Sequence, residues 1–149
     1  MMNVSLLTML RSGRFGPVEL GASRKFIRDV FGEPDDYAVM SKRRPHFQDI
    51  WVFGDIEFHF DQSTDQVWLI YTDTFEIPAG SGAFSLDPWV LRWNRPLEDV
   101  CAALDDADVG WEFDPNPPPD VVGVLTSGGV QLGFLRNEGL QAISLCQRP

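Results

Sequence analysis

The sequence predicts an α+β fold of two tandem repeats, each a helix followed by a four-stranded antiparallel meander, with the helices on one face of the sheet. The main observation is a pattern that recurs at a constant offset of 74 residues: GDIEFHF (54–60) returns as GGVQLGF (128–134). In both copies the apolar residues follow a helical period first and then alternate with period two, as strands do. We therefore expect one compact domain over 1–149, with repeats at 21–72 and 95–146.

Two helices are predicted ahead of the first strands. Asn3 is a candidate N-cap for a short helix over 4–12, which Gly13 would end. Ser23 is the candidate N-cap of the repeat helix, and Gly32 its end, since Gly32 is followed by a proline two residues later. Between them runs an apolar stripe that we expect to face the core: Phe26, Ile27, Val30 and Phe31.

The first meander is predicted from period-two patterns at 37–41, 49–53, 56–60 and 67–72. Gly54-Asp55 suits a two-residue hairpin turn, which places Trp51 opposite Phe58 and Phe53 opposite Ile56. One face of this hairpin is then strongly apolar and predicts the core side: Trp51, Phe53, Ile56, Phe58 and Phe60.

A connector over 73–94 separates the repeats. It carries Trp89 and Trp93, which a flexible linker would not, so we expect it to pack across both halves, with 89–93 as a further strand. The second helix is expected to begin at Pro96, with strands at about 111–114, 121–127, 130–135 and 140–146. The run DPNPPPD (114–120) predicts an exposed loop, because proline cannot donate to a strand ladder.

Composition and charge narrow the classes of function. Hydrophobic residues make up 44% of the chain, which predicts a folded core, and no apolar run reaches the roughly 20 residues of a membrane helix. The start lacks the features of a signal peptide, and the two cysteines, Cys101 and Cys146, are expected as buried thiols of a cytoplasmic protein, although a disulfide stays open.

The net charge is −10, and it is uneven, since residues 49–149 carry seventeen Asp and Glu against four Lys and Arg. Such a surface repels nucleic acid and attracts a basic protein.

The motif of the first repeat resembles a known unit. Gly21, Ser23, Ile27, Phe31, Gly32 and Pro34, followed by Trp51-x-x-Gly54 and an alternating strand, are similar to the helix-to-hairpin unit of beta-lactamase inhibitor proteins and of small outer-membrane-assembly lipoproteins. The resemblance implies a tandem-repeat fold whose open sheet face binds another protein. In size and charge the chain also resembles the small acidic immunity proteins encoded beside bacterial toxins.

Conventional catalytic and metal-binding patterns are weak. Glu57 and His59 lie two apart on one strand and offer two metal ligands, whereas zinc needs three or four. The turn Asp61–Asp65 lacks the glycine and glutamate of a calcium loop. We therefore predict no catalytic residue, no metal site and no cofactor.

The open sheet face is the better candidate site. The hairpin register turns Ile50, Val52, Glu57 and His59 away from the core, and Trp68 and Ile70 would join them if Phe60 opposes Val67. The leading hypothesis is a non-catalytic, protein-binding module of immunity or inhibitor type that docks a basic protein through this face. The alternatives are a structural protein that forms a homodimer through the face, and an enzyme or small-ligand binder that uses Glu57 and His59 in a cleft between the repeats.

Overall fold

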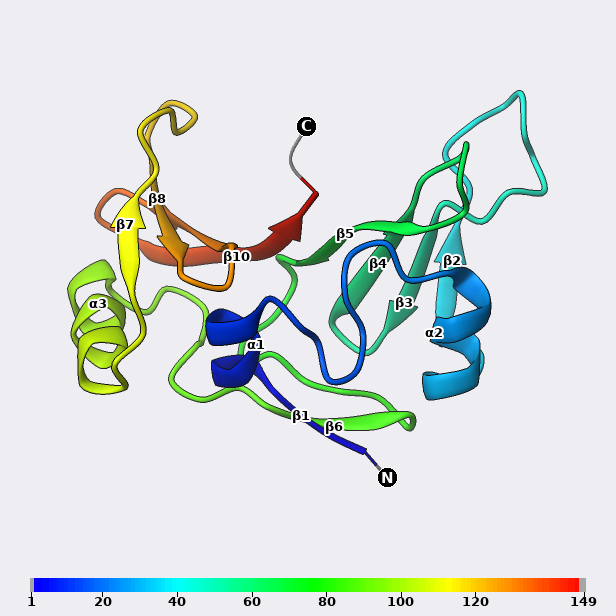
Figure 1. Ribbon diagram of the computed structural model, residues 1–149. Helices are drawn as coiled ribbons and strands as arrows, with labels where there is room; N and C mark the ends of the chain where they lie inside the picture. The colour runs from blue at the N-terminus through cyan, green and yellow to red at the C-terminus, as the bar shows by residue number, and fades with distance from the viewer. Residues whose placement is uncertain (1, 148–149) are drawn as a thin grey trace.

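The computed structural model describes residues 2–147 and shows a mixed α+β protein built on one large antiparallel sheet (Figure 1). The eight strands lie in the order β2-β3-β4-β5-β10-β9-β8-β7. Their bounds are β2 Asp36–Ala38, β3 Ile50–Phe53, β4 Ile56–Phe60, β5 Val67–Thr72, β7 Trp111–Phe113, β8 Val121–Thr126, β9 Val130–Leu135 and β10 Gly139–Cys146.

The sheet has two halves that meet at β5 and β10. Strands β2 to β5 pair with their neighbours in chain order, as do β7 to β10, and the last strands of the two sets pair antiparallel, with Tyr71 opposite Ser144. A helix precedes each set, α2 (Arg24–Phe31) the first and α3 (Leu97–Asp106) the second. Both helices lie on the same side of the sheet, one at each end (Figure 1).

Helix α2 begins and ends where the sequence predicts. The Ser23 hydroxyl accepts a hydrogen bond from the Phe26 N–H at 3.0 Å, and Gly32 ends the helix with a φ of 81°. Ile27 and Phe31 are buried, but the Phe26 side chain is 41% exposed, so its expected place in the core is wrong. The helix is only eight residues long, and its buried side is narrower than the apolar stripe.

The predicted hairpin register is confirmed: Trp51 pairs with Phe58 and Phe53 with Ile56 across the turn at Gly54. Strand β2 is shorter than the expected 37–41, because the chain turns away at Met40, whose N–H donates to the Asp49 carboxylate at 2.8 Å. The loop that follows returns to the sheet at Ile50.

The N-terminal segment and the connector differ from the prediction. Residues Met2–Ser5 form a strand, β1, and the helix α1 covers Leu6–Ser12, with Ser5 rather than Asn3 as its N-cap. Strand β1 pairs in parallel with β6 (Phe84–Asp87). Residues 89–93 are not a strand, since Trp89 has a positive φ of 57° and lies in a turn after Pro88.

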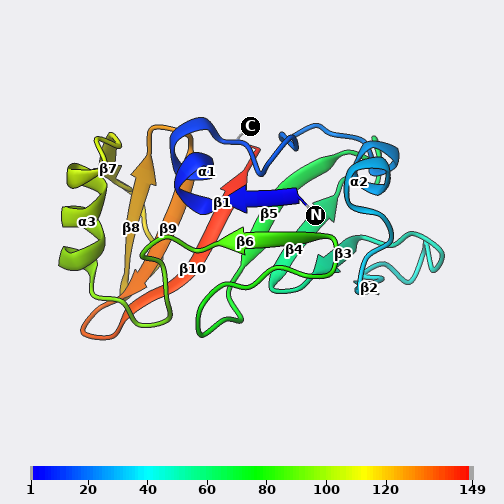
Figure 2. The ribbon, with the colours of Figure 1, turned by 90° about the horizontal axis from the view of Figure 1, so that it is seen from below.

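The core lies between the large sheet and a layer formed by α1, β1, β6 and the connector (Figure 2). Phe84 of β6 is fully buried, and its ring centroid lies 5.2 Å from that of Phe15 and 4.8 Å from that of Phe31. The rings of Phe15, Phe31 and Phe84 pack onto the aromatic face of the β3–β4 hairpin, since the ring centroids of Phe58 and Phe15 are 5.6 Å apart. The connector is therefore a core element, which agrees with its aromatic composition.

Candidate functional site: the outer face of the sheet

The face of the large sheet that points away from α1, β1 and β6 is called the outer face below. The helices and the β1–β6 pair all lie on its opposite side (Figures 1 and 2). The strand registers place two sets of side chains on it: Ile50, Val52, Glu57, His59, Trp68, Leu69 and Tyr71 in the first half, and Leu125, Gln131, Gly133, Leu135, Ala142, Ser144 and Cys146 in the second.

Five of the six predicted site residues lie on this face, and one does not. Ile50, Val52, Glu57 and His59 are half-buried on the outer face, and Trp68 is 37% exposed. Ile70 is 2% exposed and pairs with Phe58 on the core side. The prediction for Ile70 is wrong because a β-bulge intervenes: His59 pairs with Leu69 but Phe60 with Val67, so Trp68 is the extra residue.

The bulge also brings in two residues that the sequence reasoning missed. Leu69 and Tyr71 take the outer-face positions that a regular strand would give to Trp68 and Ile70. The sequence carries no signal for the bulge, because Val67–Thr72 is apolar at most positions and shows no alternation that an extra residue could interrupt. Only the pairing partner reveals the insertion.

A polar pair lies at the centre of the first half. His59 Nε2 and Glu57 Oε1 are 2.9 Å apart, and both side chains are largely buried among their neighbours. The imidazole stands edge-on to two aromatic rings, with centroids 5.9 Å from that of Trp68 and 6.4 Å from that of Tyr71. The pair can present one carboxylate and one imidazole to a ligand, which is fewer than a zinc site requires.

Tyr71 closes this cluster toward the end of β5. Its hydroxyl donates to the Asp73 carboxylate at 3.1 Å. Partial burial, reinforced by the negative charge of Asp73, raises the pKa of Tyr71 to about 12. The phenol therefore remains a protonated hydrogen-bond donor on the outer face at every physiological pH.

The second half of the outer face carries smaller residues at its centre. Gly133 and Ala142 pair directly on β9 and β10, and a Cβ atom on Gly133 would come no closer than 3.9 Å to Ala142. Beside them, Gln131 donates to the Asp114 carboxylate at 2.6 Å. Large side chains therefore gather on the first half, and small ones on the middle of the second.

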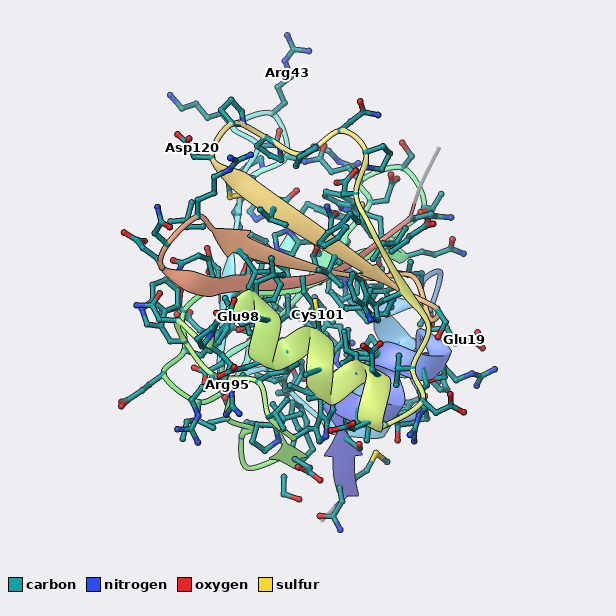
Figure 3. The ribbon with its side chains drawn as sticks, turned by 90° about the vertical axis from the view of Figure 1, so that its left-hand side faces the viewer. Glu19, Arg43, Arg95, Glu98, Cys101 and Asp120 are labelled. Atoms are coloured by element: carbon teal, nitrogen blue, oxygen red, sulfur yellow. The ribbon has the colours of Figure 1, made fainter. Side chains whose placement is uncertain are left out.

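Loops of opposite charge flank the two ends of this face. The β2–β3 loop carries Lys42, Arg43 and Arg44, whereas Asp114 and Asp120 bound the proline-rich β7–β8 loop. Figure 3 shows Arg43 and Asp120 both projecting on the side of the sheet that faces away from α3. Asp49 anchors the basic loop, since its carboxylate accepts hydrogen bonds from the Met40 N–H at 2.8 Å and from Gln62 at 2.9 Å.

The connector tryptophans leave the outer face free. Trp89 packs against the hydrophobic core. The backbone N–H of Trp93 donates to the Glu76 carbonyl oxygen. The indole ring of Trp93 lies edge-on to the buried ring of Phe75, with the centroids 6.2 Å apart.

A cavity and the two cysteines lie apart from the Glu57–His59 pair. A cavity of about 530 Å³ lies between the start of α3 and the β9–β10 turn, and Glu57 and His59 do not line it. Within residues 2–147, no three His, Cys, Asp or Glu side chains gather as a metal site would need, and no helix is long and apolar enough to cross a membrane. Cys101 and Cys146 are both free thiols, and Cys146 is exposed rather than buried as expected, because it lies at the outer-face end of β10.

Comparison with known proteins yields one distant likeness. A solved structure of a DUF4309 family protein, YjgB from Bacillus subtilis, is similar with a TM-score of 0.46 and 15% sequence identity, covering 90% of this chain and 84% of that chain. No protein-family model and no curated protein matches the chain.

Proposed function

We propose that the chain is a non-catalytic, protein-binding module of inhibitor or immunity type, which docks a basic protein through the outer face. The observation that carries this proposal is the open outer face itself, with the 37% exposed Trp68 beside Leu69 and the His59–Glu57 pair. Tryptophan and other aromatic residues are enriched at the energetically dominant positions of protein interfaces. A rigid sheet also presents such residues without the ordering cost of a loop.

Charge supports the choice of a basic partner. The chain has a net charge of −10 and a pI of about 4.4. Electrostatic attraction to a basic protein raises the association rate, and the acidic surface disfavours nucleic acid, whose phosphates it would repel. We assign the module to the cytoplasm, where the two free thiols would stay reduced.

The proposal includes a duplicated architecture. The turn glycines Gly54 and Gly128 are 74 residues apart, as are the buried, core-facing Phe60 and Phe134 of the strands that follow. Each half consists of a helix and four strands in chain order, and the two halves meet through antiparallel β5 and β10. This arrangement supports two tandem repeats, comparable to the units of beta-lactamase inhibitor proteins, with a shared core and a continuous outer face.

Cross-linking from single positions tests the proposal. A photo-reactive amino acid is placed at Trp68 on the outer face, or at Phe26, which is similarly exposed at 41% but lies on α2. In an extract of the native host, we expect a basic protein to be cross-linked from position 68 and not from position 26. The same protein should bind the Phe26→Ala variant and be lost with Trp68→Ala.

Two results would contradict the docking assignment. One is capture of the same protein by Trp68→Ala and by the unaltered chain with equal affinity. The other is cross-linking from position 26 alone. Once a partner is known, its affinity should fall with ionic strength, because charge attraction between acidic and basic surfaces is screened by salt.

A further inference from the structure

We propose that in the absence of a partner the outer face pairs with the outer face of a second copy of this chain. In this dimer the first half of each sheet (β2–β5) lies over the second half (β7–β10) of the other copy. The inference goes beyond the proposed function, because it needs no other protein, although the two would compete for the same face. Two independent complementarities, one of size and one of charge, support it.

The first complementarity is one of size. Trp68 is 37% exposed on the first half, and the half-buried ring of His59 packs edge-on against it, with the centroids 5.9 Å apart. The positions 74 residues later hold Gly133 and Ala142, which pair directly on neighbouring strands. A Cβ atom added at Gly133 would make only ordinary contact, with Ala142 at 3.9 Å. One half thus carries large side chains at positions where the other carries small ones, and close packing favours an arrangement in which large side chains meet small ones.

The second complementarity is one of charge. Lys42 and Arg43 are exposed in the loop at the β2 end, and Glu112 and Asp120 are exposed at the β7 end. Arg43 and Asp120 both project beyond the outer face (Figure 3). A copy lying over this face therefore meets a basic loop at one end and an acidic loop at the other.

Symmetry selects one arrangement. A two-fold axis that lies between the facing sheets and perpendicular to the line joining the two loops exchanges the halves. It brings each basic loop to the partner's acidic loop and lays the bulky half over the small one. An axis along that line would instead oppose like charges and set the bulky halves against each other. Closed, isologous dimers of this kind are the commonest homo-oligomers.

The net charge of −10 on each copy does not prevent this pairing. At physiological ionic strength the screening length is about 8 Å, so charges on the far sides of the two copies interact weakly. Arg43 and Asp120 project beyond the outer face, so the oppositely charged loops would meet directly and their attraction would be screened least. The remaining repulsion weakens the dimer, which allows a partner to displace the second copy.

Sedimentation equilibrium of the purified chain tests the inference without any partner. We expect a reversible monomer–dimer equilibrium. Gly133→Leu puts a large side chain at the small-residue position and should raise the dimer dissociation constant at least about tenfold, which is about 1.4 kcal/mol. Trp68→Ala removes the large side chain and should do the same. Gly82→Leu is the control, because a Cβ atom at Gly82 meets nothing within 4 Å and Gly82 lies in the connector.

Charge exchange tests the register. Lys42→Glu with Arg43→Glu gives a chain with two acidic loops, and Glu112→Lys with Asp120→Lys gives one with two basic loops. Each variant alone should dimerise at least about tenfold more weakly, and an equimolar mixture should restore association as a heterodimer. Circular dichroism establishes that each variant is folded.

Three outcomes would overturn the inference: a monomer at every concentration, a dimer that Gly133→Leu and Trp68→Ala leave unchanged, or a failure of the two charge variants to associate with each other. None of them bears on the proposed function, which is tested by cross-linking to a different protein. Conversely, if no partner is cross-linked from position 68, the proposed function fails, but the sedimentation experiment still tests the dimer.

Discussion

Gly128 lies so close to Gly13 that a Cβ atom on Gly13 would come within 2.5 Å of the Gly128 carbonyl oxygen. The two residues join the end of α1 to the β8–β9 turn. The Leu10 carbonyl oxygen of α1 accepts hydrogen bonds from the Gly128 N–H at 2.9 Å and from the Thr126 hydroxyl at 2.7 Å. The N-terminal helix is thereby fixed to the second half of the sheet through backbone contact that only glycine permits.

We expect Gly128→Ala to lower the free energy of unfolding by about 1–3 kcal/mol, because the new methyl group overpacks a rigid contact. Its Cβ would lie 2.6 Å from the Leu10 carbonyl oxygen and 2.7 Å from the Gly13 nitrogen, both of them backbone atoms. Urea unfolding followed by tryptophan fluorescence measures the loss. Gly133→Ala is the control and should change stability little, since its Cβ meets only ordinary contacts. Equal stability of the two variants would refute the argument.

Much of the sheet follows from local patterns. The β3–β4 register could be predicted because the Gly54 turn and five alternating apolar residues specify the same pairing. The pairing of β1 with β6 could not, because it joins residues about 80 positions apart, as in Met2 with Phe84, and the two segments carry no matching signal. The helix predicted over 4–12 begins only at Leu6, because residues Met2–Ser5 form a strand that pairs with β6.

The candidate site could also be predicted only in part, for the residues whose positions follow from the β3–β4 hairpin. Glu57 and His59 follow directly from the hairpin register, and Ile50 and Val52 with them. The β5 residues depend on the bulge at Trp68, which replaces Ile70 by Leu69 and Tyr71 on the outer face. A bulge adds one residue without changing the apolar character of the strand, so hydrophobic periodicity cannot locate it. The contrast between large side chains on the first half and small ones on the second could be recognised only once the strand order was known.

The Asp49 carboxylate should stabilise the basic loop in a pH-dependent way. Partial burial raises its pKa, but hydrogen bonds from the Met40 N–H and the Gln62 side chain lower it more, so the net pKa lies below the ordinary value. A carboxyl group with a lowered folded pKa stabilises the fold above its unfolded pKa, about 3.9, and this contribution is lost as the pH falls through the folded pKa. Asp49→Ala should cost about 1 kcal/mol at neutral pH.

The measurement is urea unfolding of Asp49→Ala and of the unaltered chain at pH values from neutral to below 4. The difference in unfolding free energy should be constant near neutrality and shrink in acid. A difference that stays the same below pH 4 would show that the charge of Asp49 does not contribute.

Tyr71 should titrate apart from an ordinary phenol. Its pKa is raised to about 12 by partial burial and by the Asp73 carboxylate that accepts its hydrogen bond. The folded state therefore holds the phenolic proton more tightly than the unfolded chain, whose tyrosines ionise near 10. The resulting stability is complete below about pH 10 and is lost as the pH rises through 12.

The chain has two tyrosines, so Tyr37→Phe leaves Tyr71 as the single phenol. Phenolate absorbance of this variant should rise near pH 12 when folded and near 10 in urea. Adding Asp73→Asn should move the folded value downward, toward 10. A folded titration near 10 in the Tyr37→Phe chain itself would contradict the assigned role of burial and Asp73.

Arg24 should be the most important charged residue for stability. Its guanidinium donates to Asp65 at 2.9 Å and to the Gln48 carbonyl oxygen at 2.7 Å, and it lies 3.9 Å from the centre of the Phe60 ring. Lysine cannot reproduce this forked geometry. We expect Arg24→Lys to lower the free energy of unfolding by about 1–2 kcal/mol and Arg24→Ala by about 2–4 kcal/mol.

The neighbouring residue supplies the control. Lys25 pairs with Asp29 at 2.7 Å, but its side chain is 82% exposed, and such pairs contribute less than about 1 kcal/mol. Lys25→Ala should therefore leave the urea midpoint almost unchanged, while Arg24→Ala shifts it clearly. Because Arg24 also holds the residues just before β3 against α2, its loss should expose Trp51 and red-shift the tryptophan emission of the folded state. Equal effects of the two substitutions would mean that the aromatic enclosure of Arg24 adds nothing to an ordinary surface ion pair.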